Sequence, residues 1–410
     1  MKKIILFLLV ITPLLTLAQG AGIHFQHETT WKEIQAKAKT ENKYIFMDCF
    51  TTWCGPCKYM SASIFPLQEV GAFMNDKFVS VKVQLDTTKN DNEFVKSWYQ
   101  DSHDLAKKYN VTVYPTYLVF DANGNIIHRF VGSSPADEFL SGVKKSINPE
   151  TQYYPLLAKY KNGKKDQEFL RNLALSSFDA YDRESAREIS NEYLATQTDL
   201  YTKDNLEFIK KFTKSSGDNG FDILIQNPDK VDAVLGKGTA ASVIQPVIFR
   251  EITFKYLPAD GKANPDWNKI YAIIAKKYPA QANEAIAKAK VIWYQSSRDW
   301  NNYQTAIVNY MNKYGGTASP EELNNYAWTV FQNCPDMKCV AEALEWSKRS
   351  FEKNEVPGFI DTYANILYKL GKKDDAIKWE QKAMDVAQDA DKKGYQEVID
   401  KMKKNEKTWN

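Results

Sequence analysis

Histidine and cysteine are scarce, with four histidines and five cysteines among 410 residues. A structural zinc site needs four such ligands, usually two CxxC pairs or one pair with two closely spaced histidines. The chain has a single CxxC pair, Cys54 and Cys57, and no other cysteine or histidine falls at a matching spacing. Covalent haem attachment needs a histidine directly after the second cysteine, where Lys58 stands. We therefore expect neither a metal site nor a cofactor.

Excess charge of one sign is also missing, because the net charge is only +3. This value is too small to argue for nucleic acid or for an anionic membrane surface as a partner. No low-complexity segment and no run of like charges stands out. Composition therefore favours a folded protein of two or three domains.

The N-terminus has a basic start at residues 1–3, an apolar run over 4–17 and a small-residue cleavage pattern over 16–18. This order is typical of a signal peptide, and the apolar run is too short for a comfortable membrane span. A bacterial lipoprotein would have cysteine after the cleavage point, where Gln19 stands. We expect a signal peptide over 1–18, export to the periplasm or beyond, and no membrane span after cleavage. An uncleaved anchor is the alternative.

The CxxC pair reads Cys54-Gly55-Pro56-Cys57 and follows an apolar strand at 44–50. A CxxC at the point where a strand turns into a helix is typical of a reversible dithiol. Unpaired amides and the positive end of the helix dipole favour a thiolate on Cys54, which is therefore the expected attacking sulfur. Cys57 lies one turn further in and is expected to resolve the mixed disulfide. A purely structural disulfide is the alternative, but so small a ring gains little chain entropy.

Asp48 lies in the middle of the apolar strand. A buried carboxylate costs several kcal/mol unless it has a partner or a task. Asp48 precedes Cys54 by six residues and can point back under the helix start, where a raised pKa would suit it to deprotonate Cys57. The alternative is a polar core residue satisfied by the backbone. Cys49 faces the other side of the strand and is expected to be an inert buried thiol.

From Asp48 to Lys58 the chain resembles the thioredoxin superfamily, with a buried Asp, an aromatic-rich strand and Trp-Cys-Gly-Pro-Cys-Lys. The similarity covers about residues 29–147 and implies an α/β thioredoxin fold, a central mixed sheet flanked by helices. Other matching segments are 79–86, 105–111, 114–120, the hairpin 121–125 and Val131-Gly132. A polar stretch at 87–104 is longer than usual, and we interpret it as structural rather than as a lid or docking surface.

The resemblance also implies roles for residues outside the CxxC pair. Lys82 matches the lysine that pairs with the buried Asp, and Pro115 matches a cis-proline that faces the two cysteines. The residues alone would favour an ordinary trans proline at a strand edge. The backbone of Tyr114 would pair with an extended substrate. The implied peptide-binding groove comprises Trp53, Gly55, Pro56, Tyr114 and Pro115.

After residue 148 apolar residues recur at helical spacing, and glycine and proline fall mainly between segments. The sequence at 343–346 is echoed 33 residues later at 376–379, which resembles a tetratricopeptide array. Stacked hairpins would offer a concave surface for a partner, or serve as a scaffold. We therefore divide the mature chain into a thioredoxin-like domain at 19–148, a helical region at 149–320 and tetratricopeptide-like hairpins at 321–410.

Cys334 and Cys339 form a C-x4-C pair in the loop of the first clear hairpin. In an exported protein such a pair predicts a local structural disulfide. A second redox centre is the alternative, although the pair lacks the tryptophan, the buried acid and the proline loop of the first.

These features together predict an exported thiol-disulfide oxidoreductase that reduces or isomerises disulfides of extracytoplasmic proteins. Because an exported thiol does not stay reduced unaided, a membrane electron donor is expected. The Gly-Pro pair and the buried acid resemble reducing thioredoxins, at about −270 mV, more than a strong oxidant at about −120 mV. Alternatives are a dithiol oxidase, or a partner-binding helical module with a redox-sensing thioredoxin-like domain.

Overall fold

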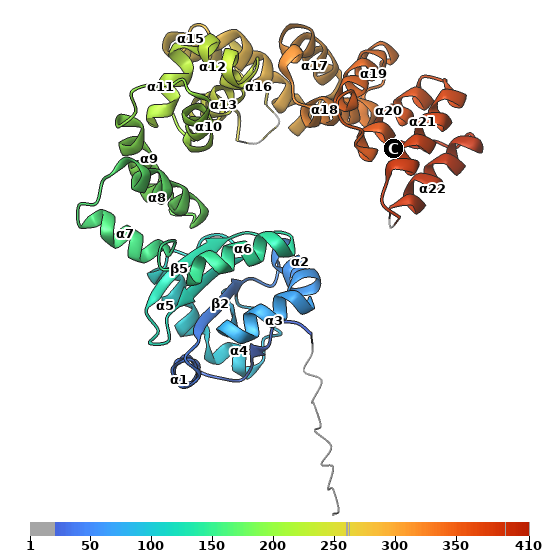
Figure 1. The fold of residues 1–410 in the computed structure, drawn as a ribbon. Helices are drawn as coiled ribbons and strands as arrows, with labels where there is room; N and C mark the ends of the chain where they lie inside the picture. The colour runs from blue at the N-terminus through green and yellow to red at the C-terminus, as the bar shows by residue number, and fades with distance from the viewer. Residues whose placement is uncertain (1–20, 260, 262, 390, 410) are drawn as a thin grey trace, which may run out of the picture. The chain divides into compact units, whose positions relative to one another are not determined.

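The computed structural model describes residues 21–259, 261, 263–389 and 391–409, so the predicted signal peptide at 1–18 lies outside the described residues (Figure 1). The chain divides into two compact units, the first ending at Gln197 and the second starting at Thr198. The first unit therefore continues past the domain boundary predicted after residue 148.

The first unit is built around a five-stranded sheet with the strand order β1-β3-β2-β4-β5. Its central strand β2 runs parallel to β3 and antiparallel to β4, which confirms the predicted mixed sheet. The strands are β1 (Phe25–Gln26), β2 (Tyr44–Phe50), β3 (Phe78–Gln84), β4 (Thr116–Phe120) and β5 (Ile126–Val131).

Strand β2 is apolar on both faces because helices cover both sides of the sheet. Ile45, Met47 and Cys49 pack into one core with residues of α1 (Trp31–Glu41) and α5 (Tyr99–Lys108). Phe46 packs into the opposite core with residues that follow α2 (Gly55–Tyr59) and residues of α3 (Gln68–Lys77) and α6 (Ala136–Ile147). Asp48 is two residues from Phe46 and shares its face of the strand. Cys49 thus lies on the other face from Asp48, as the sequence predicts.

Helices α1 to α6 connect and cover the strands (Figure 1). Residues 87–104 hold α4 and the start of α5, in agreement with a structural interpretation of this longer stretch. The elements are α1 (Trp31–Glu41), α2 (Gly55–Tyr59), the π-helix η1 (Met60–Ile64), α3 (Gln68–Lys77), α4 (Glu93–Ser97), α5 (Tyr99–Lys108), α6 (Ala136–Ile147), α7 (Tyr153–Lys161), α8 (Gln167–Asp179) and α9 (Arg183–Ala195).

Helix α7 is attached to the edge of the sheet. The amide of Tyr153, its first residue, donates a hydrogen bond of 3.0 Å to Nδ1 of His128 in β5. The Tyr153 hydroxyl donates to Oδ2 of Asp182, at 2.7 Å, just before α9. These two bonds join α7 to the sheet and to the start of α9 within the first compact unit.

All regular elements described in the second unit are helical. They are α10 (Lys203–Phe212), α11 (Asn219–Gln226), α12 (Pro228–Leu235), α13 (Thr239–Ile248), η2 (Phe249–Thr253), α14 (Phe254–Tyr256), α15 (Trp267–Lys277), α16 (Ala282–Ser296), α17 (Trp300–Tyr314), η3 (Gly315–Thr317), α18 (Pro320–Asn333), α19 (Met337–Phe351), α20 (Pro357–Lys369), α21 (Lys373–Val386) and α22 (Lys392–Lys403). Within the described ranges, no helix has the length and apolar character needed to cross a membrane.

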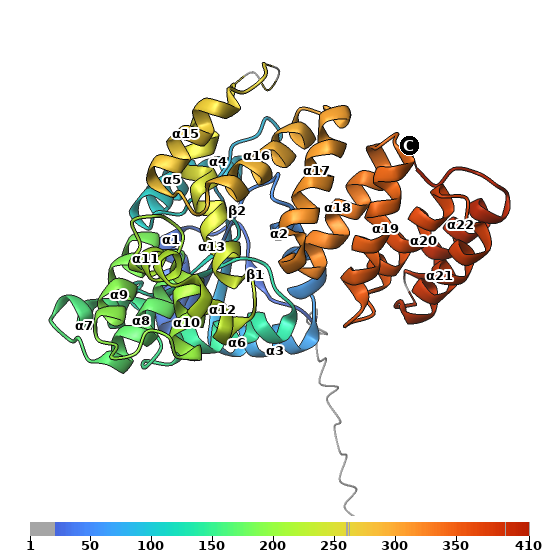
Figure 2. The same cartoon turned by 90° about the horizontal axis from the view of Figure 1, so that it is seen from above.

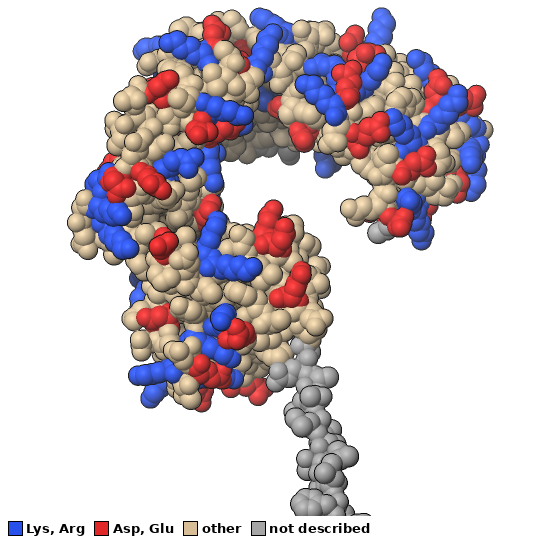
Figure 3. Space-filling view, in the orientation of Figure 1, with Lys and Arg blue, Asp and Glu red and all other residues tan. Residues whose placement is uncertain are grey.

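The last helices of the second unit form successive hairpins, α18 with α19 and α20 with α21 (Figure 2). Ala343 and Ala376, which mark the 33-residue repeat, are both fully buried. Small residues at these positions let paired helices approach closely, as the repeat predicts. Assignment to the tetratricopeptide family itself stays a prediction. On the face drawn in Figure 3, basic and acidic side chains are interspersed, in keeping with the small net charge.

Candidate active site

Cys54 is the N-cap of α2 and is joined to Cys57 by a disulfide with an S–S distance of 2.07 Å. The Cys57 amide donates a hydrogen bond of 3.1 Å to Cys54 Sγ. One of the amides that a helix start leaves without a carbonyl partner therefore points at this sulfur. Pro56 lies in the first turn, where its missing N–H leaves no acceptor unpaired. Sulfur at this position is therefore placed to carry negative charge when the disulfide is reduced.

Burial does not distinguish the two cysteines in the disulfide form. Cys57 is shielded, as the sequence predicts, with 4% of its surface exposed, but Cys54 is equally buried at 3%. The rim around them is open, because Trp53 is 68% exposed and Gly55 and Pro56 are also exposed. The helix cap, rather than exposure, therefore distinguishes Cys54 from Cys57.

Asp48 is 1% exposed, and burial raises its pKa to about 6 although the nearby Lys82 ammonium opposes the shift. Lys82 lies opposite Asp48 in the β2–β3 register, with Nζ 3.5 Å from Oδ2. Within the described structure, Oδ1 of Asp48 has no hydrogen-bond partner. The structure therefore gives no support to a carboxylate satisfied by the backbone. It supports a group that exchanges a proton near neutral pH.

Lys82 connects this buried carboxyl to the surface. Its Nζ donates a hydrogen bond of 2.5 Å to Ser61 Oγ, and its side chain is 24% exposed. Both residues line a cavity of about 480 Å³ bounded by residues 21–25. The Lys82 ammonium and the Ser61 hydroxyl therefore face a cavity on the side of the site away from the CxxC rim.

The peptide bond between Tyr114 and Pro115 is cis, as the family resemblance implies. The Tyr114 ring lies 5.8 Å from the Trp53 ring at an angle of 88°. Thr116, the next residue, pairs with Cys49 at the end of β2 from which the chain continues to Cys54. Sheet register therefore brings the proline loop beside the CxxC turn, and the predicted groove residues lie at one edge.

Two contributors to the site carry no signal in the sequence. Ser61 lies in the π-helix η1 that follows α2, and it accepts a hydrogen bond from Lys82 there. Asp86 accepts hydrogen bonds from the amide of Thr52, at 2.9 Å, and from its hydroxyl. This contact fixes the loop immediately before Trp53. Both hydrogen-bonded pairs join segments more than 20 residues apart, so no local sequence pattern predicts them.

The other cysteines are free thiols. Burial raises the pKa of Cys49 far above its usual range, which agrees with an inert thiol. Cys334 and Cys339, predicted to form a disulfide, are unbonded in this structure but share a hydrogen bond between their buried side chains. Their pairing stays a prediction. Across the described ranges, no three His, Cys, Asp or Glu side chains gather as metal ligands.

A family model described as a thioredoxin-like domain matches residues 31–146. Thioredoxin H2 of Arabidopsis thaliana is 30% identical over 123 residues, which cover 30% of this chain and 77% of the relative. A thioredoxin of Echinococcus granulosus is 36% identical over 95 residues, covering 23% of this chain and 71% of the relative. The chain belongs to the thioredoxin family.

The thioredoxin-like domain also resembles a solved structure from Bacteroides thetaiotaomicron described as a candidate disulphide isomerase. The two are 35% identical, over 32% of this chain and 98% of the other, with a TM-score of 0.27. Thioredoxins are thiol-disulfide oxidoreductases, and the Cys54–Cys57 pair lies at disulfide distance as their CxxC pair does. Each of these matches covers about a third of the chain or less.

Proposed function

We propose that this chain is an exported thiol-disulfide oxidoreductase that reduces or isomerises disulfides of extracytoplasmic proteins. The observation that supports this most strongly is the Cys54–Cys57 disulfide at a helix N-terminus, preceded in sequence by a buried Asp48 whose pKa is raised to about 6. A purely structural disulfide would need no nearby proton acceptor with a pKa near neutrality. The signal-like N-terminus supports export.

Reduction of a client proceeds in two exchanges. The Cys54 thiolate attacks one sulfur of the client disulfide, so that a Cys54–client bond forms and the other client sulfur leaves as a thiolate. Asp48 takes the proton of the Cys57 thiol, and the Cys57 thiolate attacks Cys54. The mixed disulfide breaks, and the client leaves with its second thiolate. The client has then gained two electrons, and the Cys54/Cys57 dithiol has been oxidised to a disulfide. A membrane donor of two electrons would restore the dithiol.

The groove supports a polypeptide client. Trp53 presents an exposed ring beside Tyr114, and the Tyr114 backbone immediately precedes the cis bond, ahead of β4. An extended peptide can pair with the Tyr114 backbone through main-chain hydrogen bonds, which do not depend on client sequence. Unfolded or flexible exported proteins are therefore the proposed substrates.

The test uses the protein from residue 19 onwards, without the predicted signal peptide. We expect it to reduce insulin in the presence of dithiothreitol, and we expect its redox potential to lie closer to about −270 mV than to about −120 mV. A value near −120 mV would support an oxidase instead. Replacing Cys57 with Ser should trap clients as mixed disulfides on Cys54, and Cys54→Ser provides the matched control that traps none.

A redox-sensing binding module is the second candidate, because the second unit ends in successive helical hairpins. Stacked hairpins commonly hold a peptide or partner on one surface. This function would give slow insulin reduction together with a partner affinity that changes on oxidation of Cys54 and Cys57. Rapid turnover with an affinity independent of redox state would exclude it.

A further inference from the structure

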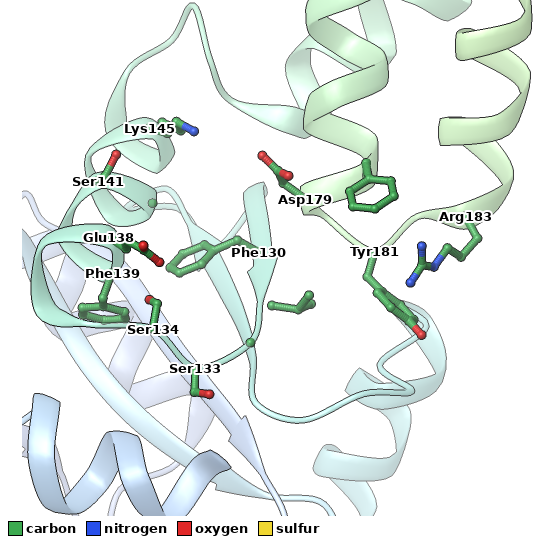
Figure 4. A pocket seen from close by; sticks show the side chains of 14 residues that line it. Phe130, Ser133, Ser134, Glu138, Phe139, Ser141, Lys145, Asp179, Tyr181 and Arg183 are labelled. Carbon is green, nitrogen blue, oxygen red and sulfur yellow. The ribbon is translucent and has the colours of Figure 1, made fainter. Parts of the chain in front are cut away.

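A cavity of about 510 Å³ lies in the first unit, between the sheet edge and the turn that joins α8 to α9 (Figure 4). One wall is formed by the end of β5, the loop 132–134 and one face of α6. The other wall is formed by residues 178–183, which lie outside the family match at 31–146. The second wall is therefore an addition of this chain to the thioredoxin-like domain.

The cavity shares its rim with the peptide groove. Gly132, which lines the cavity, donates its amide to the Pro115 carbonyl at 3.0 Å. Val131, also in the wall, pairs with Thr116 directly after the cis-proline. The wall of the cavity is therefore bonded directly to the loop that carries the cis-proline.

The cavity offers aromatic surface. The Phe130 ring belongs to the first wall and lies on the side of α6, with ring centres 4.8 Å from Tyr117 and 6.2 Å from Phe139 (Figure 4). Gly142 makes this position possible, because a Cβ there would lie 3.3 Å from the Phe130 ring.

The facing wall presents aromatic surface and a cation. It carries Phe178 and Tyr181, and the Arg183 guanidinium lies 4.0 Å from the Tyr181 ring centre and 5.3 Å from that of Phe178 (Figure 4). Aromatic and aliphatic side chains pack favourably on such faces, and the guanidinium adds a partner for a further ring. The serines at 133, 134 and 141 line the same cavity and supply hydroxyls for polar backbone groups.

The added wall is held in place. The Tyr153 hydroxyl donates to Asp182, which also accepts from the Ser185 amide at 3.1 Å and thereby caps α9. Tyr153 is in turn bonded through its amide to His128 in β5. A preorganised wall loses little entropy when a ligand binds, so its contacts contribute to selectivity.

We propose that this cavity seats an aromatic or large aliphatic side chain of an unfolded client, close to the disulfide being attacked. The α8–α9 turn then selects clients by the residues that flank their cysteines. The inference rests on the proposed function, because it assigns the substrate preference of the same site. A small free ligand is the other occupant that the test can reveal.

The test compares two disulfide-bonded peptides that differ only in one residue near the cysteine, phenylalanine or serine, at several positions in turn. A small aliphatic disulfide, oxidised glutathione, is the third substrate. For the unmodified protein we expect kcat/KM to be about tenfold higher for the best phenylalanine peptide than for its serine partner, mainly through KM. Equal values at every position would overturn the inference.

Two variants change the cavity in opposite ways. Ser141→Trp adds a side chain from the exposed face of α6 and fills the cavity without removing packing. Tyr181→Asn removes the added wall, and asparagine tolerates the positive φ of 57° at this position. Both should abolish the preference for phenylalanine while leaving oxidised glutathione reduction within about twofold. Leu67→Ser, which replaces an exposed apolar residue outside the cavity, should leave the preference intact.

The outcomes separate the two proposals. A protein that reduces none of the three substrates contradicts the proposed oxidoreductase function. A protein that reduces all three, with a phenylalanine preference unchanged in both cavity variants, contradicts only the role of the cavity. Binding of free phenylalanine to the unmodified protein and to neither cavity variant, with no peptide preference, would assign the cavity to a small ligand and overturn the inference.

Discussion

Lys82 Nζ lies 3.5 Å from Asp48 Oδ2, yet this ion pair does not keep the pKa of the Asp48 carboxyl at its ordinary value. Burial outweighs the attraction and raises the pKa of Asp48 to about 6. The ammonium is partly exposed and also donates to Ser61, so solvent weakens its effect on the carboxyl. Asp48 can therefore accept and release a proton close to neutral pH.

Replacing Asp48 with Asn should slow the release of client from Cys54, because Cys57 loses its proton acceptor. We expect a decrease of about 10²-fold in the rate of resolution at pH 7. In the unmodified protein this rate should rise with pH through about 6, the pKa of Asp48, and the variant should lack that rise. Rapid-mixing kinetics of mixed-disulfide decay measures both effects. An unchanged pH profile in the variant would show that Asp48 is not the base.

The same substitution should stabilise the protein. Because the folded pKa of Asp48 lies above that of the unfolded chain, stability falls as pH rises from about 4 to about 6 and stays lower above that window. Asp48→Asn removes this cost, and we expect the free energy of unfolding at pH 8 to rise by about 1–3 kcal/mol. Denaturant unfolding at pH 4 should show little difference. A variant less stable at pH 8 would contradict the account of Asp48.

A second buried carboxyl, Glu380 in α21, gives a prediction for the helical unit. It is 0% exposed, and burial together with the neighbouring Asp361 carboxyl raises its pKa to about 10. Glu380 is therefore protonated when folded and ionised when unfolded at neutral pH, so the unit loses stability as pH rises from about 4.5 towards 10.

Replacing Glu380 with Gln should raise the melting temperature of the second unit at pH 8, by an amount equivalent to about 1–3 kcal/mol, and leave it unchanged at pH 4. Calorimetry at the two pH values measures this difference. Glu342→Gln, at an exposed position in α19, is the control and should have no effect at either pH. A destabilised Glu380→Gln protein at pH 8 would mean that the carboxylate is required in its charged form.

Cys334 and Cys339 lie within hydrogen-bonding reach at the junction of α18 and α19, so a disulfide between them requires little movement. In the exported protein we expect peptide mass spectrometry to find them joined. The double substitution to serine should lower stability by about 2 kcal/mol under oxidising conditions only. Free thiols in protein isolated from the periplasm would contradict this prediction.

The parts of the site that could be predicted are those set by short stretches of chain. The CxxC turn, the helix start at Cys54 and the strand that carries Asp48 follow from neighbouring residues. The opposition of Lys82 to Asp48 and the cis bond at Pro115 came from family resemblance, because both depend on strand register or on loop packing.

Other features depend on contacts that the sequence does not display. The π-helix that aims Ser61 at Lys82 has no propensity signal. The first unit extends to Gln197. In this extension Tyr153 forms hydrogen bonds with His128, which precedes it in the chain, and with Asp182, which follows it. Glu380 reads as an ordinary surface residue of a helix until its neighbours are known. The local sequence therefore predicts the redox-active residues, while contacts between distant segments determine which side chains surround them.

Alkylation of the reduced protein with iodoacetamide near pH 7, followed over time by mass spectrometry of each cysteine, examines the activation of Cys54 directly. We expect Cys54 to react at least about tenfold faster than Cys57 and faster than free cysteine, since only Cys54 caps the helix. If both thiols react no faster than free cysteine, the helix start does not activate Cys54 and the proposed exchange mechanism is wrong.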